Sequence, residues 1–173
     1  MRSRLLLLAT LSVPALLQAQ AAAPNLDGTF TLAESREDVQ TRINTAIDAA
    51  TEEMNFILRG IARDRLRAKN PVRVRLTTQV AGDRIVVSYD NDRYESQSGQ
   101  WRSVTATGET AQLLQQIQGN RIYQTFRTAD GEKRMVLTFS EDGAWVWLDV
   151  TVTSSRIPAP LRYRMRFRRQ QAG

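Results

Sequence analysis

The 173-residue sequence contains neither histidine nor cysteine, and its only lysines are Lys69 and Lys133. These absences exclude a Ser-His-Asp triad, a Cys-His pair, a thiolate zinc site, histidine-ligated haem and any disulfide. The chain also lacks a Gly-rich phosphate loop, a G-x-S-x-G nucleophile elbow and a Ser-x-x-Lys motif. These absences leave two chemistries open, which are carboxylate acid–base catalysis and a metal bound by oxygen ligands. Because neither is supported by the pattern of acidic residues, we predict no cofactor and no enzymatic activity.

The acidic residues do not form a pattern that supports either remaining chemistry. Asp90, Asp92 and Glu95 are spaced somewhat like calcium ligands, but the glycine and the spacing of a calcium loop are missing, and turn formation explains the aspartates. Glu52 and Glu53 are adjacent on a predicted helix, so their side chains do not face each other. The sequence predicts no metal site and no catalytic residues.

The first 21 residues have the three parts of a secretory signal peptide. Arg2 and Arg4 form a basic start, residues 5–17 are mostly apolar, and Ala19-Gln20-Ala21 matches a cleavage site. The apolar stretch is too short to span a membrane. We predict a signal peptide at residues 1–21 and a single mature domain at residues 22–173.

Export without disulfides suits a bacterial periplasm, or secretion from a bacterium, better than a eukaryotic secretory route. The chain has a formal net charge of +6 and 22 arginines against two lysines. Codon bias in a GC-rich genome explains this excess more simply than selection for an anionic partner. Because an exported chain does not meet nucleic acid, we expect no nucleic-acid partner.

The first half of the mature chain is predicted to hold one strand and a long helical segment. Residues 27–32 resemble a strand, and Ser35 resembles a helix N-cap. Apolar residues spaced by three and four between Val39 and Ile61 indicate one amphipathic stripe. Asn70-Pro71 ends the pattern. Gly60 leaves open whether the segment is one helix or two helices with a break.

After Pro71 the apolar residues alternate with period two, and turn-forming residues recur at short intervals. Successive glycines are separated by 9, 11, 12 and 12 residues, which is typical of an antiparallel meander. These glycines are Gly99, Gly108, Gly119, Gly131 and Gly143. Residues 111–118 fit a short helix and a strand equally well.

The predicted fold class is mainly β, within the α+β class. An antiparallel meander of about seven to nine strands would curl into a barrel or half-barrel to hide its edges. The helical segment, inserted after the first strand, would bury its apolar stripe against this sheet or across its open end.

The segment Leu26-Asp27-Gly28-Thr29-Phe30 starts the first strand with the pattern L-x-G-x-aromatic. Together with the helical insertion and the meander, it resembles the calycin superfamily, which includes lipocalins and fatty-acid-binding proteins. The segment 138–143 and the arginine-rich segment 156–169 are similar to those of exported bacterial lipocalin-like β-barrel proteins of unassigned function. The resemblance implies a barrel that holds a small ligand.

One family feature does not carry over. Fatty-acid-binding proteins hold a ligand carboxylate with an Arg-x-Tyr motif on the last strand. Here Arg162-Tyr163-Arg164 places arginine and tyrosine on opposite faces.

The last predicted strand alternates four arginines with four apolar or aromatic residues. The arginines are Arg162, Arg164, Arg166 and Arg168. If they face outward, they form a solvated cationic stripe that discourages edge pairing. If they face inward, they form a strong anion site. The cost of burying four unpaired charges favours the outward arrangement.

Other strands have faces of mixed polarity, which would suit either core packing or a ligand cavity. Trp145 and Trp147 share one strand face, and Tyr123 and Arg127 share another. The candidate ligand-binding residues are Trp145, Trp147, Tyr123, Arg127, Arg162, Arg164 and Arg166.

Two functions follow from these observations. The first is an exported periplasmic binding protein, lipocalin-like, that holds a small apolar or amphipathic ligand in a cavity of roughly several hundred Å³. The alternative is a non-enzymatic envelope interaction protein that docks through a basic and aromatic surface on an envelope protein or an anionic envelope lipid or polymer. Such docking would weaken with salt.

Overall fold

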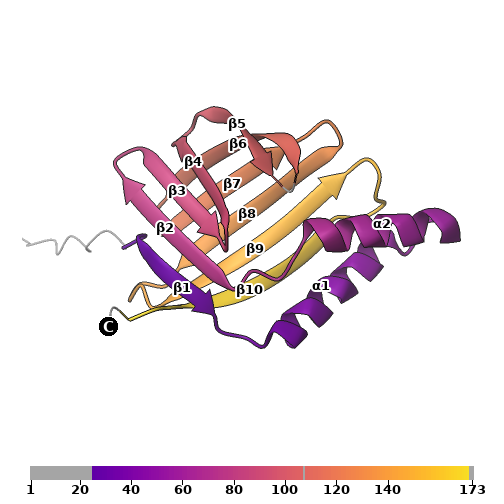
Figure 1. Cartoon of the computed structure of the whole chain (residues 1–173), viewed down its shortest axis with the longest axis horizontal. Helices are drawn as coiled ribbons and strands as arrows, with labels where there is room; N and C mark the ends of the chain where they lie inside the picture. Colours follow the sequence, from indigo (N-terminus) through magenta and orange to yellow (C-terminus); the bar gives the residue numbers. More distant parts are fainter. Residues whose placement is uncertain (1–24, 107, 172–173) are drawn as a thin grey trace, which may run out of the picture.

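The computed structural model describes residues 25–106 and 108–171, so the predicted signal peptide lies outside the described residues. Ten strands and two helices follow one another along this part of the chain (Figure 1). The helices are α1 (Arg36–Thr51) and α2 (Phe56–Lys69). The strands are β1 (Gly28–Leu32), β2 (Arg75–Ala81), β3 (Arg84–Tyr89), β4 (Asp92–Gln97), β5 (Trp101–Ala106), β6 (Glu109–Gln118), β7 (Arg121–Arg127), β8 (Gly131–Phe139), β9 (Trp145–Ser154) and β10 (Leu161–Arg169).

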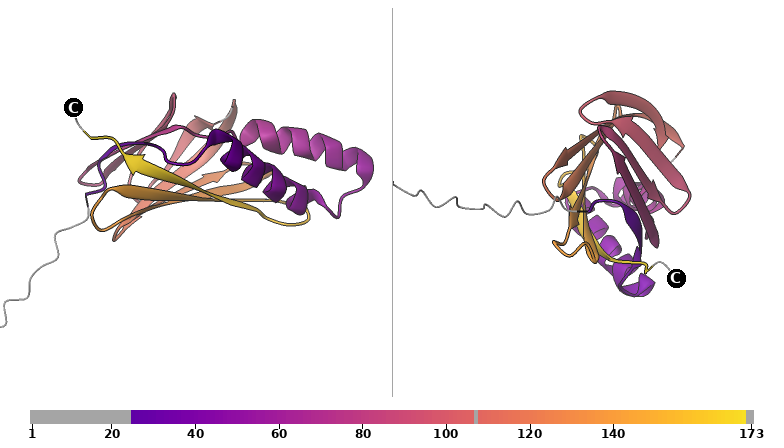
Figure 2. Two further views of the ribbon diagram at one scale, coloured as in Figure 1. Left: turned by 90° about the horizontal axis from the view of Figure 1, so that it is seen from below. Right: turned by 90° about the vertical axis from the view of Figure 1, so that its left-hand side faces the viewer.

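All ten strands belong to one antiparallel sheet with the order β4-β3-β2-β1-β10-β9-β8-β7-β6-β5. The first and last strands are neighbours, because β1 pairs with β2 on one side and with β10 on the other. The sheet curls on itself, so β4 and β5 become its two edges (Figure 2). The predicted fold class is therefore confirmed as a nearly closed antiparallel barrel with a helical insertion after the first strand.

The ambiguous segment 111–118 is strand, within β6. Ala111, Leu113 and Gln115 are buried, whereas Gln112 and Gln116 between and after them are exposed, which is the alternation of a strand. This strand is hydrogen-bonded to β5 on one side and to β7 on the other. The two backbone ladders outweigh the local helical spacing.

The helical segment is two helices, and the break does not fall at Gly60. The chain leaves the helix after Thr51, and Asn55 starts α2 by accepting a hydrogen bond from the Leu58 backbone N–H at 3.0 Å. Gly60 lies inside α2. The predicted cap at Ser35 is confirmed, since its hydroxyl oxygen accepts from the Asp38 N–H at 3.0 Å.

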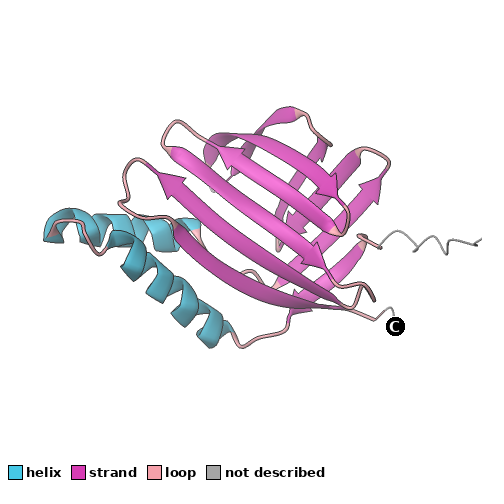
Figure 3. Cartoon of the chain, turned by 180° about the vertical axis from the view of Figure 1, so that it is seen from behind, coloured by secondary structure: helices cyan, strands magenta, loops and turns pink. Residues whose placement is uncertain are grey.

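The break also divides the predicted apolar stripe. In α1, Val39, Ile43 and Ile47 are fully buried. In α2, Ile57 and Ile61 are 74% and 50% exposed. Because α2 starts in a new direction, its residues do not continue the buried face of α1. The two helices lie beside one end of the barrel (Figures 1 and 3). Neither helix of the described part is long and apolar enough to cross a membrane.

Side chains along each strand point alternately into the barrel and out to solvent. On β10, Leu161, Met165 and Phe167 are buried, and the arginines between them are exposed. The outward arrangement of the arginine stripe is thus confirmed. The arginines stay in water, and the apolar side chains occupy the interior.

Hydrogen bonds between buried side chains hold the two edges of the sheet near each other. The Tyr89 hydroxyl of β3 donates to the Gln124 amide oxygen of β7. Gln124 Nε2 donates to Gln115 Oε1 at 2.7 Å, and Gln115 Nε2 donates to Ser96 Oγ at 3.0 Å and to the Ile85 carbonyl at 3.2 Å. In the described chain, β4 and β5 are the two edges of the sheet and form no ladder with each other. The network crosses the gap between these edges, because it joins β3 and β4 on one side to β6 and β7 on the other.

We predict that Gln115→Leu lowers the free energy of unfolding by about 1–3 kcal/mol, because it leaves the buried Gln124 amide and Ser96 hydroxyl with fewer partners. Gln116→Leu is the matched control, since Gln116 is exposed on the same strand. We expect it to change stability by no more than about 0.5 kcal/mol. Urea unfolding measures both. Equal effects of the two substitutions would contradict a closing role for the network.

Candidate functional site

A cavity of about 510 Å³ lies between α2 and the barrel interior. Leu58 and Ile61 of α2 line its outer part. Tyr94 of β4, Phe126 of β7 and Met135 of β8 line it from the sheet and belong to the buried core. Aromatic and aliphatic side chains therefore form most of the surface that a ligand would contact.

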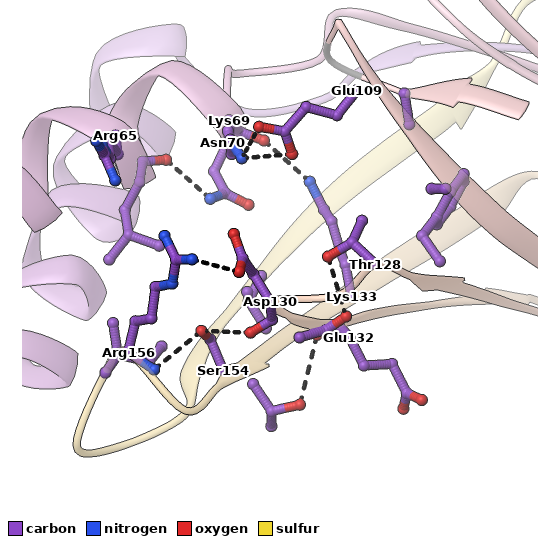
Figure 4. Close-up of a pocket in the computed structure, with 18 of the residues that line it drawn as sticks. Arg65, Lys69, Asn70, Glu109, Thr128, Asp130, Glu132, Lys133, Ser154 and Arg156 are labelled. Carbon is purple, nitrogen blue, oxygen red and sulfur yellow. Dashed lines mark hydrogen bonds and ion pairs between the residues drawn. The ribbon is translucent and has the colours of Figure 1, made fainter.

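Charged pairs connect the elements around this cavity (Figure 4). Lys69 at the end of α2 pairs with Glu109 of β6, with both carboxylate oxygens 2.7 Å from Nζ. Arg156, in the connection between β9 and β10, pairs with Asp130 in the β7–β8 turn at 2.5 Å. The hydrogen bonds and positive charge of Lys69 lower the pKa of Glu109, so this carboxylate stays ionised at neutral pH. The pairs tie the helix end and the turns together around the cavity.

Glu132 also borders the cavity but is paired with two arginines of the outer face. Its carboxylate lies 3.0 Å from Arg127 Nη2 and 2.5 Å from Arg134 Nε. Burial raises the pKa of Glu132, and the hydrogen bonds and charges of the two arginines outweigh that effect and lower it. Glu132 is therefore an anion that is already neutralised by its neighbours.

Lys133 of β8 is a cation directed toward the cavity that Figure 4 draws. Its Nζ donates a hydrogen bond to the backbone carbonyl of Lys69, at 3.2 Å. Burial, and then the positive charge of Arg73, lower the pKa of Lys133 to about 8, whereas Asp92 opposes this shift. Lys133 is therefore mostly protonated at pH 7, although its surroundings disfavour the charge.

Arg73 and Tyr163 supply further polar groups to the same cavity. Arg73 is paired with Asp92 at 2.7 Å and lies 3.7 Å from Asp90. The Tyr163 hydroxyl donates to Asn70 Oδ1 at 3.2 Å. Burial raises the pKa of Tyr163, so it remains a neutral hydrogen-bond donor.

The seven residues proposed from the sequence as ligand contacts lie on the outer face of the barrel. They occupy the positions between the buried residues of β7, β9 and β10. They are Trp145, Trp147, Tyr123, Arg127, Arg162, Arg164 and Arg166, and the cavity is lined by other residues. Arg127 borders a second, shallow hollow beside the β7–β8 turn. The inward faces of these strands carry Val146, Leu148 and Tyr163 instead.

The outer residues contact other side chains of the outer face. The guanidinium groups of Arg166 and Arg168 lie 5.2 and 5.6 Å from the centre of the Trp145 ring. Arg164 pairs with Asp149 at 2.7 Å. A role for these residues in binding a ligand on the outside of the barrel stays a prediction.

The cavity residues that sequence reasoning missed are Lys133, Arg73 and Tyr163. A signal for Lys133 was available, because it has the same strand parity as Met135 and Leu137, which are buried. Once those two residues are placed inside, Lys133 must also face inward. Arg73 precedes β2, in a segment without strand pairing, so no parity argument applies to it.

The acidic turn at residues 90–95 has a structural role. Asp90 Oδ1 accepts hydrogen bonds from the backbone N–H groups of Val74 and Arg75, at 3.0 and 2.9 Å. Glu95 is paired with Arg84 and Arg93. Across residues 25–106 and 108–171, no three acidic side chains gather in a way that could hold a metal ion.

No protein-family model and no curated protein sequence matches the chain. Solved structures of similar fold do exist. A "REP1-NXSQ fatty acid transporter" shares 14% identity with a TM-score of 0.54, covering 86% of this chain and 98% of its own. Human cRBP IV shares 13% identity with a TM-score of 0.51, and the match covers 84% of this chain and 98% of cRBP IV.

A fatty-acid-binding protein from brain tissue of Drosophila melanogaster shares 9% identity, with a TM-score of 0.51 and coverage of 82% and 96%. At these identities the likeness establishes the fold. The chain is a nearly closed antiparallel β-barrel with a fold similar to that of these structures, as expected from the sequence.

We predict that Lys133→Met raises the free energy of unfolding at pH 7 by about 1–3 kcal/mol, because it removes a charge from an apolar cavity. The pKa of Lys133 is lower in the folded chain than the ordinary value of 10.5. Between about pH 8 and pH 10 the unfolded chain therefore binds more protons, and the stability of the unsubstituted chain rises with pH. The difference in the free energy of unfolding between Lys133→Met and the unsubstituted chain should therefore become smaller over this range.

Urea unfolding at pH 7 and at about pH 9.5 measures this difference. Lys69→Met is the control, since Lys69 is the other lysine and its ion pair with Glu109 is half exposed. Its effect on the free energy of unfolding shows how much of the change comes from replacing a half-exposed lysine at this end of the cavity. If Lys133→Met and the unsubstituted chain differ in the free energy of unfolding by the same amount at both pH values, burial does not shift the pKa of Lys133.

Proposed function

We propose that this chain is an exported, non-enzymatic binding protein that holds a small apolar or amphipathic molecule in the barrel cavity. The observation that carries the proposal is the cavity itself, whose volume of about 510 Å³ lies in the range of small-molecule sites. Its aromatic and aliphatic lining would favour an apolar ligand. The signal-peptide pattern at residues 1–21 and the absence of cysteine support export to a periplasm.

Two further observations support a carrier. Structures of the same fold include proteins described as a fatty acid transporter and a fatty-acid-binding protein. In addition, the acidic residues that line the cavity are occupied by ion pairs. Glu109, Asp130 and Glu132 are each within 3.0 Å of a lysine or arginine nitrogen. Such carboxylates favour a structural role over acid–base catalysis.

We predict that the mature chain binds a neutral apolar probe such as Nile red and that dodecan-1-ol displaces it. Ala111→Phe should lower the affinity for both ligands at least tenfold, because Ala111 is buried on β6 and lines the cavity. Gln112→Phe is the matched control, since it adds the same ring to the exposed face of the same strand. Fluorescence titration measures the dissociation constants.

Thermal unfolding of both variants verifies that each is folded before binding is compared. Equal affinity of the two variants, or no binding by the unsubstituted chain, would contradict the carrier function. Native mass spectrometry of protein purified from its own periplasm would then identify the class of the natural ligand.

A second candidate function is docking on an anionic envelope partner, and the outer face of β10 favours it. Arg162, Arg166 and Arg168 are exposed there and have no ion pair within the described residues. The Trp145 ring beneath Arg166 and Arg168 adds an aromatic surface. Such a face could contact phosphate groups without any ligand in the cavity.

If this docking occurs, the chain should bind vesicles that contain an anionic phospholipid, and the affinity should fall steeply as salt rises. The double variant Arg166→Gln, Arg168→Gln should bind several-fold more weakly. Arg84→Gln, Arg93→Gln makes the same change in charge on β3 and β4 and serves as the control. Co-sedimentation at low and high salt measures the binding. Salt-independent binding, or an equal loss in both variants, would argue against this surface.

A further inference from the structure

The outer surface of α2 carries apolar side chains that are left in contact with solvent. Phe56 is 88% exposed, and Ile57, Leu58 and Ile61 are each at least half exposed. These are four of the five large hydrophobic residues that are exposed within the described chain. The two helices project beyond the end of the sheet, which leaves this surface accessible to a partner (Figures 1 and 3). An apolar patch gathered on one helix is typical of an interaction site.

The exposed charges around this patch are separated by sign. Glu52 and Glu53 lie in the connection before α2. Arg65 and Arg67 lie in the second half of α2, where Arg67 pairs with Asp64 at 3.3 Å. Glu52, Glu53 and Arg65 are exposed and have no ion pair within the described residues. The patch therefore has unpaired acids at one end and an unpaired cation at the other.

Two other arginines of α2 face α1 and the connection between the helices. Arg59 donates hydrogen bonds to the Met54 carbonyl, from Nε at 3.1 Å and from Nη2 at 2.7 Å. Arg63 pairs with Asp48 of α1 at 2.9 Å. The charged residues that remain exposed near the patch are Glu52, Glu53, Asp64, Arg65 and Arg67. Because these include more acids than bases, the patch lacks the basic border that binds an anionic bilayer, and a protein partner fits it better.

The patch and its charges are complementary to a second copy of themselves. A second α2 that runs antiparallel can place Ile57 of one copy opposite Ile61 of the other. Glu53 precedes Ile57 by four residues and Arg65 follows Ile61 by four, so the same register brings Glu53 of each copy opposite Arg65 of the other. Gly60 lies near the middle of this register, and a Cβ atom there would meet nothing within 4 Å. Its bare surface therefore leaves room for the second helix.

We propose that two copies of this chain form a symmetric dimer through the outer surface of α2, with the two helices antiparallel. Burial of Phe56, Ile57 and Ile61 stabilises the contact, and the ion pairs between Glu53 and Arg65 fix its direction. A helix of 14 residues is about 21 Å long, so the interface is small and the dimer dissociates in the micromolar range. This dimer goes beyond the proposed function and requires no ligand.

The dimer also has a consequence for the cavity. Leu58 and Ile61 belong to the exposed patch and line the outer part of the cavity. The second copy therefore covers this part of the lining and removes it from water.

Sedimentation velocity of the mature chain, from about 1 to about 500 μM, tests the pairing. The unsubstituted chain should change from monomer to dimer over this range. Ile57→Ser should raise the dissociation constant of the dimer at least about tenfold, because each dimer loses two buried isoleucines. Trp101→Ser is the matched control, since Trp101 is the exposed hydrophobic residue on β5, and it should leave the dissociation constant unchanged. Thermal unfolding verifies that each variant is folded.

Reversing the two charges separately tests the direction of the helices. Glu53→Arg and Arg65→Glu each place like charges opposite each other, so each variant alone should dimerise several-fold more weakly at low salt. An equimolar mixture of the two variants should recover the unsubstituted affinity, because both contacts of the mixed dimer then join opposite charges. Arg162→Glu makes the same change on the outer face of β10, and its mixture with Glu53→Arg should show no recovery.

Each result decides for or against the dimer. A monomer at every concentration overturns the proposal, and so does a dimer that Ile57→Ser leaves intact. A mixture of Glu53→Arg and Arg65→Glu that stays as weak as its components overturns the antiparallel arrangement. A monomer that binds vesicles of phosphatidylethanolamine and phosphatidylglycerol, and loses this binding in Ile57→Ser, assigns the patch to lipid and overturns the dimer. Binding of Nile red in the cavity is measured independently, so failure of the dimer leaves the carrier function standing.

Discussion

The closure of the curled sheet is the constraint on which the rest of this structure depends. The edge strands β4 and β5 do not form a ladder with each other within the described chain, so a continuous backbone ladder does not complete the barrel. An isolated bridge between Ser98 and Gln115 joins the edges, and buried hydrogen bonds among Tyr89, Gln124, Gln115 and Ser96 support it. Because each of these polar groups is satisfied by another, burying them costs little. Closure also gives the sheet a definite interior, which determines where every strand residue points.

The cavity follows from how this interior is filled. Core side chains such as Phe30, Leu137 and Phe167 fill part of the barrel completely, and the region under α2 remains open. Ion pairs between Lys69 and Glu109, and between Arg156 and Asp130, join the helix end, β6 and the turns that surround the opening. The same region therefore combines an apolar lining, a charged border and the cation Lys133, which together suit an amphipathic ligand.

Much of the architecture could be predicted because it depends on short-range patterns. The cap at Ser35, the stop at Asn70-Pro71 and the alternation of β10 each involve residues within a few positions of one another. The break between the helices was misplaced because a glycine is a weaker signal than a capped restart, and Asn55 supplies that restart. The segment 111–118 required its partners β5 and β7, whose ladders were invisible to local spacing.

The sequence by itself determined the fold class and the two faces of each strand, since alternation is a property of neighbouring residues. For β10 it also determined which face is outside, because four arginines cannot be buried cheaply. For β7 and β9 both faces carry apolar and polar residues, so composition did not choose between them. Only the curvature of the whole sheet placed Trp145 and Tyr123 outside. The candidate site was therefore decided by tertiary structure, because a cavity is formed by residues that are distant in sequence and meet only when the barrel closes.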